Sequence, residues 1–186
     1  MNYESIFAEH ANKTVRAGLI GAGQFGASFV GQVVRTPILD IPVVCDLDAE
    51  RAAAVFIAAG YAAEEVVIAE SIPVALMALE SGKRVAVGDA DIVPQLPLDI
   101  IVEATGNPEA AAVIGVAALD EGKHLAMVTK EADSVIGPYL AARAKRSGLV
   151  ATPVDGDQPS LLIGLLSWAE LLGLEVVSAG KSSEYD

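Results

Sequence analysis

The chain has 186 residues, of which 53% are hydrophobic and 20% charged, and its formal net charge is −13. This length fits one domain with a substantial core, and the excess of acid argues against a nucleic-acid partner, because phosphate binding needs a basic surface. A single cysteine, Cys45, excludes an internal disulfide. Residues 1–14 contain no long apolar run. We therefore expect an N-terminal arm rather than a signal peptide or a membrane span, in a cytoplasmic protein.

The first predicted strand, residues 15–20, leads directly into the hexapeptide GAGQFG at residues 21–26. This is the GxGxxG pattern at a strand-to-helix turn, which is typical of dinucleotide binding. In such a turn Gly21 allows the tight bend, Gly23 lets main-chain N–H groups approach a pyrophosphate, and Gly26 lets the helix pack closely on the strand. The alternative is a plain strand-to-helix turn, since the chain contains 17 glycines.

A helix predicted over residues 24–35 begins within this hexapeptide. The first N–H groups of a helix have no acceptor inside it, and the helix N-terminus carries a partial positive charge. We therefore expect Gln24 and Phe25 to offer their main-chain N–H groups to the phosphates.

The second predicted strand, residues 41–45, ends at the acidic residue Asp46. This acid follows the glycine motif at a distance of about 20 residues, where a carboxylate binds the adenosine ribose hydroxyls. We expect Asp46 and the adjacent Leu47 to contact that ribose. We expect the cofactor to be NAD or NADP. NAD is favoured, because a carboxylate repels the 2′-phosphate of NADP. Cys45 is expected to be a buried apolar residue rather than a reactive thiol.

Apolar strands and helices alternate along the rest of the chain. Further strands are predicted at residues 66–68, 84–87, 98–104, 124–129, 149–154 and 174–179, and further helices at 49–59, 72–80, 108–121, 133–147 and 158–172. This alternation predicts an α/β fold, a Rossmann-like doubly wound parallel sheet covered on both faces. We expect the dinucleotide-binding domain to span residues 15–155. Residues 156–186 would then be a helix and a strand leading into a catalytic and dimerisation domain.

A polar turn after the strand at 98–104 is expected to lie at the same edge of the sheet as the glycine motif. Its residues, which would border the nicotinamide ribose, are Ala104, Thr105, Gly106 and Asn107. The alternative is that Asn107 and Pro108 simply begin a helix.

Two lysines follow later strands and are the candidate catalytic residues. Lys130 and Lys181 could each donate a proton to a carbonyl or hold an anionic substrate. The alternatives are a solvated loop lysine for Lys130 and a frayed chain end for Lys181. Asp133 is expected to cap the helix at 133–147. We interpret Asp155 and Asp157 as a turn and a helix cap rather than a metal site, and no HExxH or CxxC pattern is present.

Several segments together follow a family pattern: residues 15–26, 45–48, 102–110, 121–124, 131–133, 156–159 and 179–181. They resemble the homoserine dehydrogenase-like oxidoreductases, and in particular the branch with a C-terminal SAF domain that includes deoxyxylulose phosphate reductoisomerase-like enzymes. The resemblance covers nearly the whole chain. It implies an NAD(P)-binding domain, followed in the family by a dimerisation and catalytic region and then the SAF domain. The pair 129–130 departs from that branch, while Lys130 is similar to the lysine near the cofactor in homoserine dehydrogenases.

The sequence thus predicts the cofactor domain of an oxidoreductase. It would transfer a hydride to or from a small polar carbonyl or alcohol, such as homoserine, aspartate semialdehyde or a sugar phosphate. The helix at residues 160–172 is apolar almost all round, so we expect it to be buried against another domain or subunit of a homo-oligomer. The alternative function is a nucleotide-sensing module that acts through this helix. An aldehyde dehydrogenase with Cys45 as nucleophile is disfavoured, because Cys45 lies at the ribose end of the expected site.

Overall fold

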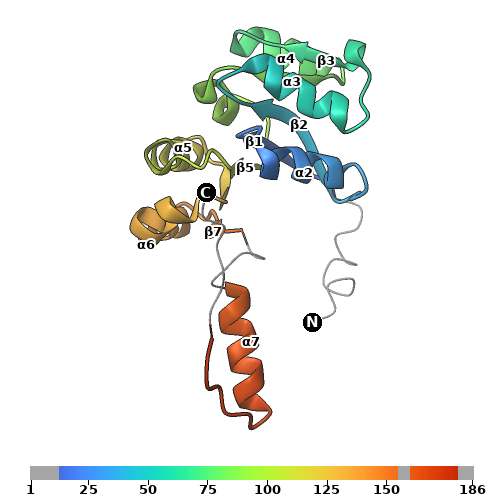
Figure 1. Ribbon diagram of the computed structural model, residues 1–186. Coiled ribbons are helices and arrows are strands. Elements are labelled where there is room, and N and C mark those ends of the chain that lie inside the picture. The colour runs from blue at the N-terminus through green and yellow to red at the C-terminus, as the bar shows by residue number, and fades with distance from the viewer. Residues whose placement is uncertain (1–12, 155–159, 180–186) are drawn as a thin grey trace. The chain divides into compact units, whose positions relative to one another are not determined.

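The computed structural model describes residues 13–154 and 160–179 (Figure 1). Asp155, Asp157 and Lys181 lie outside these ranges. The elements are β1 (Val15–Ile20), α2 (Gln24–Val33), β2 (Leu39–Cys45), α3 (Ala49–Ala58), η2 (Ala63–Glu65), β3 (Val66–Ile68), α4 (Ile72–Glu80), β4 (Arg84–Val87), η3 (Ala90–Gln95), β5 (Ile100–Glu103), α5 (Pro108–Asp120), β6 (His124–Met127), α6 (Lys130–Arg146), β7 (Ala151–Pro153) and α7 (Ser160–Leu171).

Strands β1 to β7 form one parallel sheet with the order β3-β4-β2-β1-β5-β6-β7. The chain leaves β1 toward β2 on one side and returns to β5 on the other, so the strand order reverses at β1. Leu19 of β1 lies between Val44 of β2 and Val102 of β5 in the register. This confirms the predicted Rossmann-like doubly wound sheet, in which ligands bind beyond the carboxyl ends of the strands at the reversal point.

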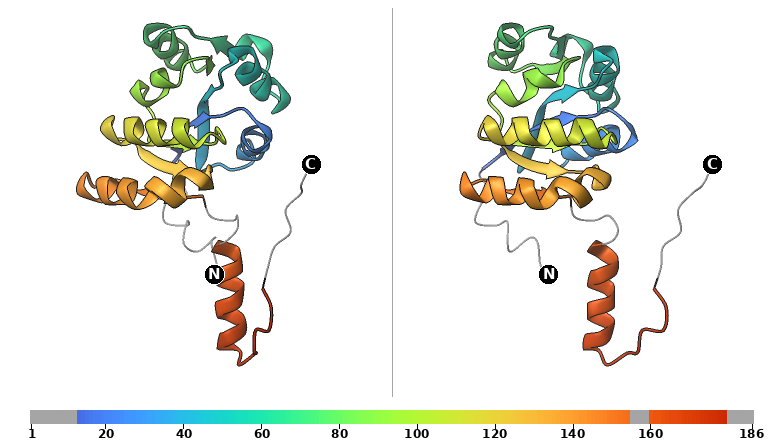
Figure 2. Two further views of the ribbon diagram at one scale, coloured as in Figure 1. Left: turned by 60° about the vertical axis from the view of Figure 1, so that its left-hand side comes forward. Right: turned by 90° about the vertical axis from the view of Figure 1, so that its left-hand side faces the viewer.

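Helices cover both faces of the sheet (Figure 2). On one face α2 and α3 pack with apolar residues such as Phe56. On the other face α4, η3, α5 and α6 pack with residues such as Leu140. Leu19, Val43 and Ile101 in the central strands are fully buried. The strands are therefore apolar on both faces, which explains why they read as continuous hydrophobic runs rather than as an alternating pattern.

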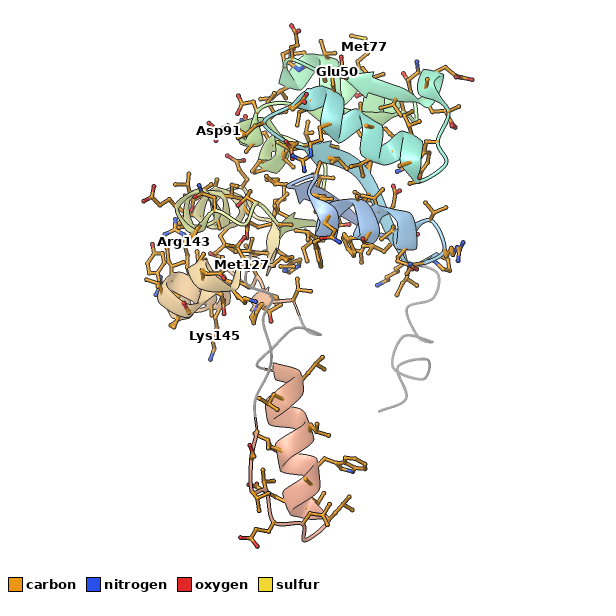
Figure 3. All side chains as sticks on the ribbon, in the orientation of Figure 1. Glu50, Met77, Asp91, Met127, Arg143 and Lys145 are labelled. Carbon is orange, nitrogen blue, oxygen red and sulfur yellow. The ribbon has the colours of Figure 1, made fainter. Side chains whose placement is uncertain are left out.

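Helix α6 is joined to α5 by polar contacts as well as by packing. The Arg143 guanidinium of α6 forms an ion pair with Asp120 at the end of α5, and its Nε donates to Asp120 Oδ1 at 3.1 Å (Figure 3). Three basic residues lie in the last turn of α6, where cations interact favourably with the helix dipole.

Two predicted elements were wrong. Helix α6 begins at Lys130 rather than near Asp133, and Thr129 is its N-cap. Asp133 therefore does not cap the helix but lies in its first turn. Residues 174–179 form no strand in the described part of the chain. A strand is defined by its hydrogen bonds to a neighbour, and this segment has no such partner among the described residues.

The chain divides into two compact units, residues 1–153 and 154–186. In the second unit α7 presents several large apolar side chains to solvent, among them Leu161, Leu165 and Trp168, with exposed fractions of 57%, 57% and 61%. The second unit by itself therefore does not bury this helix. Among those residues, no helix combines the length and the apolar character that crossing a membrane requires.

Candidate functional site

A cavity of ≈ 350 Å³ opens at the carboxyl ends of β1, β2, β4 and β5. Its volume lies within the usual range for small-ligand sites, about 300–1,000 Å³. The predicted site residues among its lining are Gly21, Gly23, Asp46, Leu47, Ala104, Thr105 and Asn107. Gln24, Phe25, Gly26 and Gly106 are neighbours of these residues along the chain and are not part of the lining. The structure therefore gathers the three predicted turns around one cavity, at the reversal point of the sheet.

The three glycines of the motif have different surroundings. Gly21 has a φ of +114°, and an added Cβ would lie 2.3 Å from the carbonyl oxygen of Ala104. An added Cβ on Gly26 would lie 2.2 Å from the carbonyl oxygen of Gly21. Neither position accepts a side chain, because both contacts are with rigid main chain. Gly23 differs, since an added Cβ there would meet nothing within 4 Å. Gly23 also lines the cavity, and the absence of a side chain there leaves its main chain open to close approach, as a phosphate-binding turn requires.

The N-terminus of α2 is suited to an anion. Its N-cap is Gly23, which has no side chain to cap the helix, and the first turn carries no acidic residue. The first N–H groups of the helix, including those of Gln24 and Phe25, therefore have no side-chain cap within the described structure. Helix N-termini of this kind bind phosphates through main-chain donors and the helix dipole.

Asp46 follows β2 and is held by two main-chain donors. Its Oδ2 accepts from the N–H of Ala22 at 2.9 Å, and its Oδ1 accepts from the N–H of Asp48 at 3.2 Å. The first bond ties the carboxylate directly to the glycine turn. Each carboxylate oxygen has further lone pairs available for ribose hydroxyls. The exposed Leu47 lines the cavity beside it.

The turn after β5 is fixed by side-chain hydrogen bonds. Asn107 is the N-cap of α5, and its Oδ1 accepts from the N–H groups of Glu109 and Ala110 at 3.0 Å each. This helix-start geometry is the alternative that the sequence left open for Asn107. Because Thr105 and Asn107 also line the cavity, the same turn is both a helix start and part of its wall.

The candidate catalytic lysines are placed less centrally. Lys130 is exposed, is the first residue of α6, and is not part of the cavity lining. Its place after β6 puts it at the carboxyl edge of the sheet, one strand beyond β5. Lys181 lies outside the described residues.

Cys45 lines the cavity but is chemically unsuited to nucleophilic attack. Its side chain is buried, as the sequence predicts, and burial together with the negative charges of Asp46 and Asp89 raises its pKa from 9.0 to about 12. The thiolate is the reactive form of cysteine, and at neutral pH this thiol stays protonated. The raised pKa therefore also disfavours Cys45 as the nucleophile of an aldehyde dehydrogenase.

Sequence reasoning missed several residues of the site. Arg51 of α3 and Gly88 after β4 also line the cavity. Gly88 could have been found, because β4 pairs with β2 and its end must lie beside Asp46. The buried carboxylate of Glu103, at the end of β5, was also missed. In the described part of the chain, no cluster of histidine, cysteine and carboxylate residues could hold a metal ion.

Comparison with known proteins gives structural neighbours only. No protein-family model matches the sequence, and no curated protein matches it. The WlbA dehydrogenase from Bordetella pertussis, solved with NADH and UDP-GlcNAcA, is similar with a TM-score of 0.57 and 16% identity over 87% of this chain and 43% of that one. An NAD-binding protein from Listeria innocua has a TM-score of 0.55 and 19% identity, covering 87% of this chain and 42% of that one.

A dehydrogenase from Chromobacterium violaceum is similar at a TM-score of 0.55, with 18% identity over 85% of this chain and 41% of that chain. The chain thus spans less than half the length of each of these three structures. At such identities the likeness establishes the fold: this chain has the Rossmann-like α/β fold of NAD-binding oxidoreductase domains.

Proposed function

We propose that this chain is the NAD(P)-binding domain of an oxidoreductase. The observation that carries the proposal is the open space at Gly23, which is the uncapped N-terminus of α2 and directly follows Ala22, whose N–H donates to the Asp46 carboxylate. The glycine turn would hold the pyrophosphate, Asp46 the adenosine ribose and the turn at 104–107 the nicotinamide end. A bound nicotinamide supplies the carbon atom that accepts or donates a hydride. The similarity to dehydrogenases solved with NADH supports this assignment.

We expect replacement of Asp46 by alanine to weaken NAD⁺ binding about tenfold or more, because hydrogen bonds to a charged group contribute about 1.5–3 kcal/mol each. Asp46→Asn keeps the shape but removes the charge, so it should weaken NAD⁺ binding less and reduce the discrimination against NADP⁺. Isothermal titration calorimetry with both cofactors measures these affinities.

The Asp46 experiment also has a clear negative result. Glu50→Gln removes a nearby exposed carboxylate in the first turn of α3 and serves as the matched control, with unchanged affinities expected. If Asp46→Ala keeps the affinity of the wild type for NAD⁺, then Asp46 does not bind the ribose.

The substrate proposal is finer and rests on the resemblance to homoserine dehydrogenase-like enzymes of the SAF-domain branch. It names a small polar carbonyl or alcohol, either homoserine and aspartate semialdehyde or a sugar phosphate such as deoxyxylulose phosphate. Lys130 and Lys181 are the proposed proton donors or substrate anchors. Turnover assays of the full gene product on homoserine and on deoxyxylulose phosphate separate these substrates. Cofactor binding without turnover of either would favour the alternative, a nucleotide-sensing module.

The exposed apolar residues of α7 support a further part of the proposal, namely association of this protein as a homo-oligomer. Leu161, Leu165 and Trp168 are each more than half exposed and follow one another at intervals of four and three residues, which places them on one face of α7. Exposed apolar faces of this kind mark interaction surfaces. Multi-angle light scattering should give a mass above that of one chain, and Leu165→Glu together with Trp168→Glu should shift it to the monomer. A wild-type mass equal to that of one chain would contradict the homo-oligomer. In the sensing alternative, α7 would then have to bind a different protein.

A further inference from the structure

A fully buried carboxylate lies at the carboxyl end of β5, beside the turn that borders the cavity. Glu103 is 0% exposed, and the residues before it in β5, Ile101 and Val102, belong to the apolar core. Burying a carboxylate is costly unless hydrogen bonds replace the lost water. The groups that contact Glu103 therefore indicate what it does.

Four groups donate to this carboxylate from two turns that are far apart in the sequence. Oε1 accepts from the N–H of Thr105 at 2.7 Å, from the Thr105 hydroxyl at 2.7 Å and from the Thr129 hydroxyl at 2.8 Å. Oε2 accepts from the N–H of Thr129 at 3.3 Å. The Thr129 hydroxyl in turn accepts from the N–H of Gly106 at 3.0 Å, so its own hydrogen is directed at Glu103.

The main chain extends this link. The carbonyl oxygen of Glu103 accepts from the N–H of Val128 at 2.8 Å, and the N–H of Ala104 donates to the carbonyl oxygen of Ile20 at 2.8 Å, just before the glycine turn. Thr129 directly precedes Lys130, and Thr105 lines the cavity. Glu103 thus lies where the turns after β1, β5 and β6 meet.

From this arrangement we infer that Glu103, acting through Thr105 and Thr129, is a positioning residue that fixes the nicotinamide end of the site relative to the start of α6. This inference rests on the proposed dinucleotide-binding function. A satisfied buried network rigidifies the groups that it joins. In the proposed site Asp46 would hold the adenosine ribose, and its carboxylate is bound by Ala22 and Asp48, neither of which bonds to the Glu103 side chain. Loss of the network should therefore weaken binding of the nicotinamide end and leave binding of the adenosine end unchanged.

The test compares Thr129→Val, which removes the hydroxyl at nearly constant shape, with Thr129→Ser, which retains it. The two probes are NAD⁺ and ADP-ribose, which lacks the nicotinamide ring, and calorimetry measures both dissociation constants. Thr129→Val should raise the dissociation constant for NAD⁺ about tenfold, because the turn at 105–106 loses the hydroxyl that joins it to Glu103 and to the start of α6. The constant for ADP-ribose should change less than about twofold, and Thr129→Ser should restore NAD⁺ binding.

Equal losses for both probes, or no loss for NAD⁺, would overturn the inference. Should Thr129→Val fail to fold, amide NMR shifts of the wild-type chain decide instead. The N–H signals of Thr105, Gly106 and Thr129 should respond to NAD⁺ and not to ADP-ribose, and an equal response to both would refute the inference. A wild-type chain that binds neither probe refutes the proposed function itself, which distinguishes the two failures.

Discussion

Replacing Gly23 by alanine should abolish most NAD⁺ binding while leaving the fold intact. The added Cβ meets no atom within 4 Å, and the backbone of Gly23 is extended with φ of −71° and ψ of −166°, which alanine adopts without strain. The methyl group would occupy space that the proposed phosphate needs. We expect the dissociation constant to rise more than about tenfold, an effect of about 1.4 kcal/mol or more, and the melting temperature to stay within about 2 °C.

The matched control for Gly23→Ala is Gly31→Ala, on the same helix. Gly31 is exposed, and an added Cβ there also meets nothing within 4 Å. This variant should bind NAD⁺ normally and be slightly more stable, because alanine favours the helix over glycine by about 1 kcal/mol. Normal NAD⁺ binding by Gly23→Ala would mean that no phosphate approaches this turn.

Replacing Gly26 by alanine should have the opposite effect and destabilise the fold directly. The added Cβ would lie 2.2 Å from the carbonyl oxygen of Gly21 and 3.1 Å from Leu19 Cδ2. The nearest atom is main chain, so either α2 or the glycine turn must move. We expect the free energy of unfolding to fall by about 2–3 kcal/mol, measured by urea denaturation. An unchanged unfolding midpoint would contradict the close packing of α2 on β1.

The part of the site that the sequence predicts is the part set by local pattern. The glycines, the first turn of α2 and Asp46 follow from a strand, a turn and a helix in fixed order. Leu47 and the turn at 104–107 follow from the rule that parallel strands end at one edge. These predictions need only the order of strands along the chain, and the observed sheet brings their residues to a single cavity.

The Glu103 network could not be predicted in the same way. It depends on β5 and β6 being neighbours and on the register that places Glu103 opposite Met127. Only this register brings Thr129, two residues after Met127, to the carboxylate. The start of α6 was misplaced for a related reason. Asp133 is a good helix cap by residue type, yet the helix already begins after Thr129, whose side chain bonds to Glu103 instead of capping it.

The most direct test of dinucleotide binding at the glycine turn is an amide NMR titration of the ¹⁵N-labelled chain with NAD⁺. If NAD⁺ binds there, the largest shift changes will fall on the N–H signals of Gly23, Gln24 and Phe25, with smaller changes at Asp46 and Thr105. An unchanged spectrum at saturating NAD⁺, or changes confined to residues away from this edge of the sheet, would contradict it.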